Sequence, residues 1–331
     1  MSVIPIFLMV LGWGYQPERV KASYSIIFYT IISSVPLLAS ISMLMVFNPA
    51  GSFRLLEFKF SSWSFSSTVS IFLTLGFLVK LPIYGMHLWL PLAHVEAPVF
   101  GSIILAGVLL KLGGVGMIRF SQLAQRDYWK IRCISIRLIG SVIVGLRCLK
   151  TTDLKSIIAF SSVSHIGLVI IMGSFRLKER VWVRFLIILT HAFRSSIIFF
   201  IRYIMYLGRG TRNILLNKGC LTFSPHIAIC WLVATIARIG TPPFINLVSE
   251  VYSLLLCWNM LGGWILATLV MFMLRRAFHL VLYSSSQQEK SRWDNLSKQA
   301  ITSTPAMPVV TCHCHSVCLI ISLVMLNEIR Y

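Results

Sequence analysis

Long apolar runs, separated by short polar breaks, dominate the sequence and predict a series of membrane-spanning helices. A helix needs about 20 consecutive apolar residues to cross a bilayer, and most of the runs approach that length. The expected spans are 3–13 (partial), 24–47, 68–84, 99–120, 131–146, 154–175, 181–207, 226–239, 244–258, 264–283 and 308–326. The sequence therefore predicts an all-α polytopic membrane protein with about ten spans.

The same pattern divides the chain into three expected domains. Residues 1–283 form the transmembrane core, residues 284–299 form a polar connecting loop, and residues 300–331 contain a C-terminal transmembrane helix. The opening stretch "MSVIPIFLMVLGWG" lacks the basic residues that begin a secretory signal peptide. We therefore expect no cleaved leader.

Prolines interrupt two of the expected spans, at Pro82 in "KLPIYG" and at Pro242–Pro243 in "GTPPF". A proline lacks a backbone donor and breaks or kinks a helix. Inside a membrane, the freed backbone groups must be satisfied by protein or by water in a cavity. Because broken helices form ion sites in many transporters, we expect functional sites at both interruptions.

The composition supports a membrane location and excludes most soluble functions. Of the residues, 57% are hydrophobic and 12% are charged, whereas soluble proteins carry about 25% charged residues. The 30 basic residues outnumber the 10 acidic ones, and many lie between spans, as the positive-inside rule expects. Because a polar face that could hold phosphates is missing, we expect membrane lipids as partners and no nucleic acid.

One cysteine–histidine cluster, "CHCHSVC" at 312–318, has two interpretations. Thiolates and imidazoles at such spacing can ligate zinc. However, the cluster leads directly into the apolar run "SVCLIISLVML", where a polar metal site would be awkward. The pattern favours a polar entry to the last span, and we expect no metal.

Five titratable side chains lie inside apolar runs, and they are Lys80, Lys111, His165, His191 and Glu250. An ionisable group at the bilayer centre costs about 3 kcal/mol, which makes it a functional candidate by default. Lysines and histidines in such surroundings can exchange protons near neutral pH. Taken alone, each residue has a structural alternative, a hydrogen bond to the backbone. One titratable group on nearly every central span nevertheless predicts a path for protons.

Several motifs resemble one known family. They are "KLPIYGMHLWLPLAHVEAPVFGSIILAGVLLKLGGVGMIRF", "WGYQPERVKASYSIIFYT", "TTDLKSIIAFSSVSHIGLV", "THAFRSSIIF", "LLNKGC" and "TPPFINLVSE". Together they resemble the chain 4 family of mitochondrial NADH:ubiquinone oxidoreductase, respiratory complex I, over residues 1–283. The resemblance implies an antiporter-like helical bundle with two broken transmembrane helices. It also implies a proton-translocating subunit of the mitochondrial inner membrane.

The resemblance assigns a role to each of the five titratable residues. Lys80 matches the central lysine of the first broken helix, and Lys111 matches the lysine on the next helix. His165 and His191 match two histidines of the hydrophilic axis in the middle of the membrane. Glu250 matches the carboxylate of the second broken helix, which passes protons toward the exit side.

The resemblance also implies which groups lie elsewhere. The chain has no G-x-G-x-x-G motif after a strand and no four-cysteine spacing of the iron–sulfur type. NADH, FMN, iron–sulfur clusters and ubiquinone are therefore expected in other subunits of the complex, with no cofactor in this chain. The expected partners are the other membrane-arm subunits of complex I.

The chain departs from the family pattern at its start. The family carries a glutamate, in a pattern like F-E-A-T-L-I-P, that pairs with the lysine of the broken helix. Here "VIPIF" matches the end of that pattern, so the acid would precede Met1, together with about four spans. Either a separate chain supplies these helices or the start of the chain is assigned too late. In the chain as it stands, Lys80 lacks its expected partner.

Two alternatives remain open beside the pump subunit. A stand-alone cation/proton antiporter of the same ancestry would carry the same residues but would not copurify with quinone-reducing subunits. A truncated scaffold subunit would hold its neighbours together without moving protons.

Arginines inside the apolar runs suggest a different reading of the gene. Arg194 and Arg238 stand where the family usually has small or neutral polar residues. Many animal mitochondria read the codons AGA and AGG as serine or glycine, so a different genetic code would remove these charges. The alternative is that both arginines are genuine and face the hydrated axis.

The code hypothesis predicts the mass of the peptide that contains Arg194. Mass spectrometry of the native chain should show serine or glycine at this position. An observed arginine would refute the hypothesis.

Overall fold

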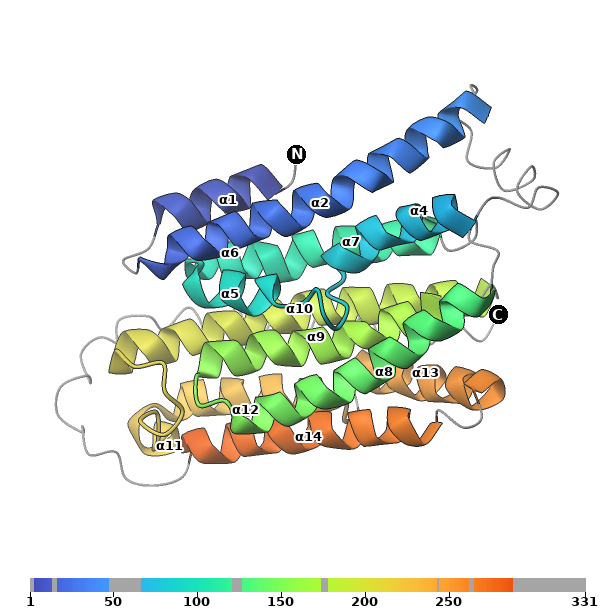
Figure 1. Ribbon diagram of the computed structural model, residues 1–331. Coiled ribbons are helices and arrows are strands. Elements are labelled where there is room, and N and C mark those ends of the chain that lie inside the picture. The colour runs from blue at the N-terminus through green and yellow to red at the C-terminus, as the bar shows by residue number, and fades with distance from the viewer. Residues whose placement is uncertain are drawn as a thin grey trace. The chain divides into compact units, whose positions relative to one another are not determined.

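The computed structural model describes residues 3–13, 17–47, 67–120, 127–173, 178–242, 244–261 and 265–287. Within this part of the chain every regular element is helical, and one isolated bridge joins Asp153 to Asn213. The chain forms two compact units, which comprise residues 1–141 with 165–188 and residues 142–164 with 189–331. Each unit is described by itself below. The predicted all-α class is confirmed (Figure 1).

The first unit contains helices α1 to α7 and parts of three longer helices. Its own elements are α1 (Val3–Gly12), α2 (Glu18–Phe47), α4 (Ser67–Lys80), α5 (Trp89–Glu96), α6 (Val99–Ile104), a π-helical turn η1 (Leu105–Leu109) and α7 (Leu110–Phe120). The longer helices, parts of which belong to each unit, are α8 (Asp127–Lys150), α9 (Leu154–Gly173) and α10 (Lys178–Arg209). The second unit adds α11 (Cys220–Phe223), α12 (Pro225–Ile239), α13 (Ile245–Leu261) and α14 (Ile265–Gln287).

Each expected apolar run within the described residues coincides with a helix. Five of the described helices are long and apolar enough to cross a membrane, and they are 18–46, 99–120, 154–171, 183–209 and 265–287. Four shorter apolar helices have 10–17 residues: Val3–Gly12, Val69–Lys80, Pro225–Ile239 and Ile245–Trp258. Helix α14 runs to Gln287. The rest of the expected loop 284–299, the expected last helix in 300–331 and the cluster at 312–318 lie outside the described residues.

Helix α2 is the element on which the first unit is assembled. It packs against α1, α4 and α5, and α1 runs beside it in Figure 1. Leu44 of α2 joins Val69 and Leu73 of α4 in one apolar cluster. A Cβ atom at Gly76 of α4 would lie 2.9 Å from the Ser33 carbonyl oxygen of α2, so a glycine is what allows this close approach of the two helices.

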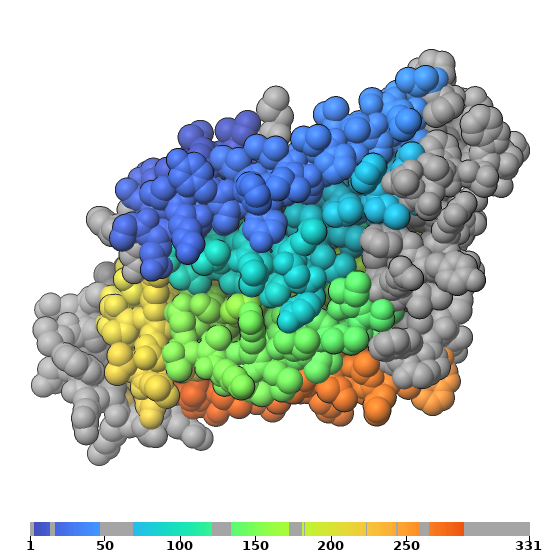
Figure 2. Space-filling view, in the orientation of Figure 1, coloured from blue at the N-terminus to red at the C-terminus, as the bar shows by residue number. Residues whose placement is uncertain are grey.

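The opposite face of α2 is apolar and exposed. Tyr24, Phe28, Val35, Leu38 and Val46 each leave more than 60% of their surface uncovered. Side chains of α2 form part of the molecular face seen in Figure 2, where they are blue. A large exposed apolar face is the expected outer surface of a helix that is surrounded by lipid or by neighbouring apolar helices.

In the second unit, α14 packs against α11, α12 and α13. Pro225 opens α12, where its missing N–H removes no helical bond. The helix ends at Gly240, whose φ of +81° lies in the left-handed region that favours glycine. Pro242 follows, Pro243 lies outside the described residues, and α13 begins at Ile245. The described part of "GTPPF" thus lies between α12 and α13, and the broken transmembrane helix at this place stays a prediction.

The contact between Gly76 and α2 predicts a stability change. In Gly76→Ala the added methyl group would overlap Ser33 and Leu37. The free energy of unfolding, measured by thermal unfolding in lipid nanodiscs, should therefore fall by about 1–3 kcal/mol. Gly12→Ala is the matched control, because a Cβ there has no neighbour within 4 Å. Equal unfolding temperatures of the two variants would contradict the close packing of α2 and α4.

Candidate functional site

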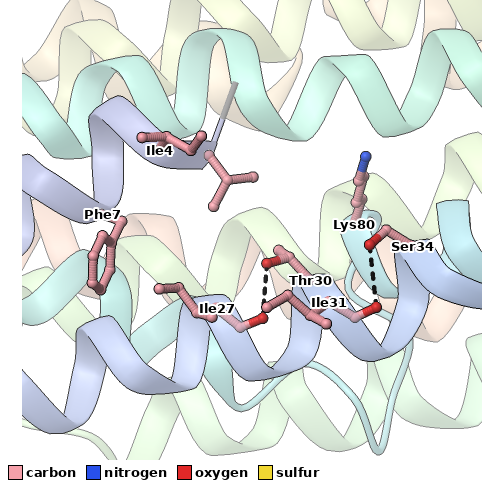
Figure 3. A pocket seen from close by; sticks show the side chains of 8 residues that line it. Ile4, Phe7, Ile27, Thr30, Ile31, Ser34 and Lys80 are labelled. Carbon is pink, nitrogen blue, oxygen red and sulfur yellow. Dashed lines mark hydrogen bonds between the residues drawn. The ribbon is translucent and has the colours of Figure 1, made fainter. Parts of the chain in front are cut away.

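Lys80 is the last residue of α4, and its half-buried side chain lines a cavity of about 280 Å³. The other lining residues belong to α1 and α2 and are Val3, Ile4, Phe7, Ile27, Thr30, Ile31 and Ser34. Figure 3 shows the ammonium group on one side of this mostly apolar lining. The hydroxyl groups of Thr30 and Ser34 donate to backbone carbonyls of α2, at 3.0 Å to Ile27 and 3.1 Å to Ile31. Among the described residues that line the cavity, Lys80 is therefore the one that carries a charge.

Pro82 determines how α4 ends beyond Lys80. The last regular bond runs from the Leu81 N–H to the Phe77 carbonyl, at 2.8 Å. The Ile83 N–H then reaches back five residues to the Leu78 carbonyl, at 3.3 Å. The chain turns through Gly85, at a φ of +97°, before α5 begins at Trp89. The predicted interruption after Lys80 is a turn that separates α4 from α5.

Lys111 lies at the start of α7, directly after the π-helical turn η1. Its ammonium group donates to the carbonyl of Ala106, which belongs to that turn. Two residues further, a Cβ at Gly113 would lie 3.0 Å from the Cβ of Lys80. Helix α7 therefore packs against Lys80 through Gly113. Lys111 lies two residues earlier, on a different face of the helix, so the structure places the two lysines on adjacent elements without a contact between their side chains among the described residues.

Arg137 of α8 connects the end of α4 to the segment of His165. Its guanidinium, 2% exposed, donates to the carbonyl of Pro82. A Cβ at Gly167 of α9 would lie 3.7 Å from the Nε of the same arginine. His165 precedes Gly167 by two residues, and its side chain is buried. In the first unit, Lys80, Lys111 and His165 thus lie on segments that meet around Arg137 and Gly113.

In the second unit, Glu250 of α13 is fully buried and held by two partners. The Asn246 amide donates to its Oε1, and Arg275 of α14 forms an ion pair with the same oxygen at 2.5 Å. A Cβ at Gly240 would lie 2.9 Å from Oε2. The left-handed glycine that ends α12 therefore also makes room for the carboxylate.

The segment of α10 that carries His191 is linked to Glu250 through Arg194 and Asn246. Arg194, one turn after the buried His191 on α10, donates to the Asn246 Oδ1 at 2.6 Å. Its other donors reach the carbonyls of Thr190 and Ala237, both at 3.0 Å. A continuous set of hydrogen bonds therefore joins the segment of His191 to the carboxylate. An arginine at position 194 thus has hydrogen-bond partners in the structure. The hypothesis that the native chain carries serine or glycine at this position stays a prediction.

Two more buried groups interact with the arginines near this carboxylate. Arg238 is 4% exposed, and its two terminal nitrogens have no hydrogen-bond partner among the described residues. His279 of α14 is 1% exposed, lies one turn after Arg275, and interacts electrostatically with Arg194, Arg238 and Arg275. Of the three arginines, Arg275 forms the ion pair with Glu250, and Arg194 reaches the carboxylate only through Asn246. Among the described residues, this cluster therefore holds more arginines than carboxylates.

Sequence reasoning did not identify Arg137, Asn246, Arg275 or His279 as site residues. Asn246 could have been found, because it precedes Glu250 by four residues and shares its helix face. The contacts of Arg137 and Arg275 join distant parts of the chain, and no local pattern indicates them. Among the described residues, no group of three or more His, Cys, Asp or Glu side chains could hold a metal ion.

Comparisons with known proteins place the chain in a family. The family described as "NADH:quinone oxidoreductase/Mrp antiporter, TM" matches residues 1–274. NADH-ubiquinone oxidoreductase chain 4 of Aedes aegypti is 41% identical over 87% of this chain and 65% of its own length. The chain 4 protein of Artemia franciscana is 36% identical over 88% of this chain and 73% of its own length. The chain thus spans about two thirds of these relatives.

Two solved structures share the fold. A chain of respiratory complex I from Thermus thermophilus superimposes with a TM-score of 0.77 at 20% identity, over 94% of this chain and 67% of that one. A chain of the membrane-bound sulfane sulfur reductase, an archaeal respiratory membrane complex, gives 0.83 at 17% identity, over 98% and 67%. At these identities the likeness concerns the fold, which is antiporter-like and membrane-embedded. The chain belongs to the NADH:quinone oxidoreductase/Mrp antiporter transmembrane family, in which its relatives are NADH-ubiquinone oxidoreductase chain 4 proteins.

Proposed function

We propose that the chain is a proton-translocating subunit in the membrane arm of NADH:ubiquinone oxidoreductase, in the mitochondrial inner membrane. The names of its relatives support the assignment to this complex. The observation that carries the proposal is Lys80, a cation at the end of an apolar helix that lines a mostly apolar cavity. An ionisable side chain among apolar helices of a membrane protein is a functional candidate by default.

In this proposal Lys80, Lys111, His165, His191 and Glu250 carry the translocated protons. The packing of Gly113 on Lys80 supports the placement of the two lysines on adjacent elements. The hydrogen bonds from Arg194 to Asn246 and from Asn246 to Glu250 support the acidic end of the path. Two broken transmembrane helices, α4–α5 and α12–α13, within a bundle of about ten spans, would supply the sites.

An acidic partner for Lys80 is part of the proposal. Val3 and Ile4, in the first turn of α1, line the same cavity as the lysine. A glutamate just before Val3 in a longer chain would therefore approach Lys80. A glutamate of a separate chain that packs at the start of α1 would do the same. Such a glutamate would form an ion pair with the Lys80 ammonium group.

Other subunits would carry the redox chemistry. We expect NADH, FMN, the iron–sulfur clusters and ubiquinone in those subunits, and none of them in this chain. Membrane lipids would cover the exposed apolar face of α2 wherever a neighbouring subunit does not.

The family description also names antiporters, so a stand-alone cation/proton antiporter is the second candidate function. Copurification separates the two candidates. Quinone-reducing subunits that remain bound after mild solubilisation support the complex, whereas an isolated transporter supports the antiporter.

Replacing Lys80 tests the proton path directly. In Lys80→Met, the side chain keeps its apolar stem and loses its charge, so the assembled complex should pump fewer protons per electron at a retained assembly level. The measurement is proton uptake in proteoliposomes that oxidise NADH. Lys21→Met, a change in the first turn of α2 away from the cavity, is the control. An unchanged proton-to-electron ratio in Lys80→Met would support the scaffold alternative.

Replacing Asn246 tests the surroundings of Glu250. Asn246→Ala removes a donor to Glu250 and an acceptor of Arg194, and a hydrogen bond to a charged group contributes about 1.5–3 kcal/mol. Pumping should therefore slow by roughly tenfold or more. Ser249→Ala is the control, because the bond of this buried hydroxyl within the described part of the chain goes to the carbonyl of Asn246 in its own helix. Equal rates in the two variants would contradict a role for the amide.

A further inference from the structure

We propose that Trp89 is a positioning residue for Lys80, because its indole N–H holds the backbone carbonyl that directly precedes the lysine. The Trp89 Nε1 donates to the Val79 carbonyl at 3.2 Å. Trp89 has no exposed surface and begins α5, ten residues further along the chain. The inference rests on the proposed proton-transfer role of Lys80 and adds a residue that controls where this lysine lies.

The need for this bond follows from Pro82. In a regular helix the Leu78 carbonyl would accept the N–H of residue 82, but proline has none. The Ile83 N–H takes over that carbonyl, although its own regular acceptor would be Val79. The Val79 carbonyl is thereby left without its regular backbone donor, and the indole N–H of Trp89 donates to it instead.

The surroundings make an indole well suited to this position. Val79 is 3% exposed, and an unsatisfied carbonyl at membrane depth costs several kcal/mol. The side chain must therefore bring a donor and fill an apolar space at the same time, which tryptophan does. Trp89 is itself held by α5, which packs on α2. The bond consequently fixes the last turn of α4 to a second element of the same unit.

The consequence for Lys80 concerns competition for donors. If the Val79 carbonyl lost the indole, the ammonium group on the adjacent residue would be a strong substitute donor. A lysine engaged by its own helix end would be drawn away from the cavity that it lines. Trp89 thus keeps the Lys80 ammonium group available for proton exchange.

The experiment removes one N–H group and keeps the shape of the ring. Trp89→benzothienylalanine, in which sulfur replaces the indole N–H, is compared with Trp89→Phe in the assembled complex. The quantity measured is the Lys80-dependent pumping. For each complex it is the proton-to-electron ratio of that complex minus the ratio of Lys80→Met. Both variants should lose this pumping by about tenfold while NADH oxidation continues.

The matched control is the same pair of substitutions at Trp231. This tryptophan is equally buried, and its Nε1 has no hydrogen-bond partner among the described residues. Its variants should keep the Lys80-dependent pumping. A shared loss at both tryptophans would mean that ring packing, rather than the N–H, is responsible, and this would overturn the inference.

The other outcomes are also distinct. If Trp89→benzothienylalanine pumps normally while Lys80→Met does not, the inference is wrong and the proposed function stands. If the isostere at position 89 prevents assembly while the isostere at Trp231 does not, Trp89 has a structural role and the inference is again wrong. If Lys80→Met pumps normally, both the proposed function and the inference are refuted.

Discussion

The missing N–H of Pro82 is the constraint on which the first unit depends. It shifts one hydrogen bond of α4 by a residue, so that Ile83 bonds Leu78 and Trp89 bonds Val79. Arg137 then donates to the carbonyl of Pro82 itself. Donors from two other elements thus satisfy backbone carbonyls on either side of Lys80, because the interior of a membrane offers no water to satisfy a helix end. The break that weakens the helix is therefore also what defines the place of Lys80.

The second unit contains a related arrangement around a carboxylate. Gly240 ends α12 in a left-handed conformation, and α13 begins five residues later with Asn246 and Glu250 on one face. Asn246 and Arg275 both contact the same carboxylate oxygen. A buried ion pair gives little net stability unless further hydrogen bonds support it, and here the amide supplies such a bond. The excess of arginines around it makes the identity of these arginines important for the charge of the whole cluster.

Much of this architecture could be predicted from the sequence. A helix that is surrounded by lipid needs a long apolar run, and the polar or proline-containing segments between such runs are visible in the sequence. The runs 24–47 and 99–120 correspond closely to α2 and to α6–α7. Helix α8, at Asp127–Lys150, exceeds its expected range of 131–146 because its charged ends also adopt helical structure. The π-helical turn before Lys111 has no sequence signature that distinguishes it from an α-helix. The bonds of Trp89, Arg137 and Arg275 depend on contacts between separate elements, which a pattern along one chain does not contain.

The central claim is that Lys80 takes up and releases a proton during turnover. Isotope-edited infrared difference spectroscopy on the assembled complex, with lysine labelled by ¹⁵N and Lys80→Met as the reference, observes this proton directly. The account predicts a band that changes between ammonium and neutral amine when NADH is oxidised, and that is missing in the variant. A Lys80 signal that stays ammonium throughout turnover would contradict the account.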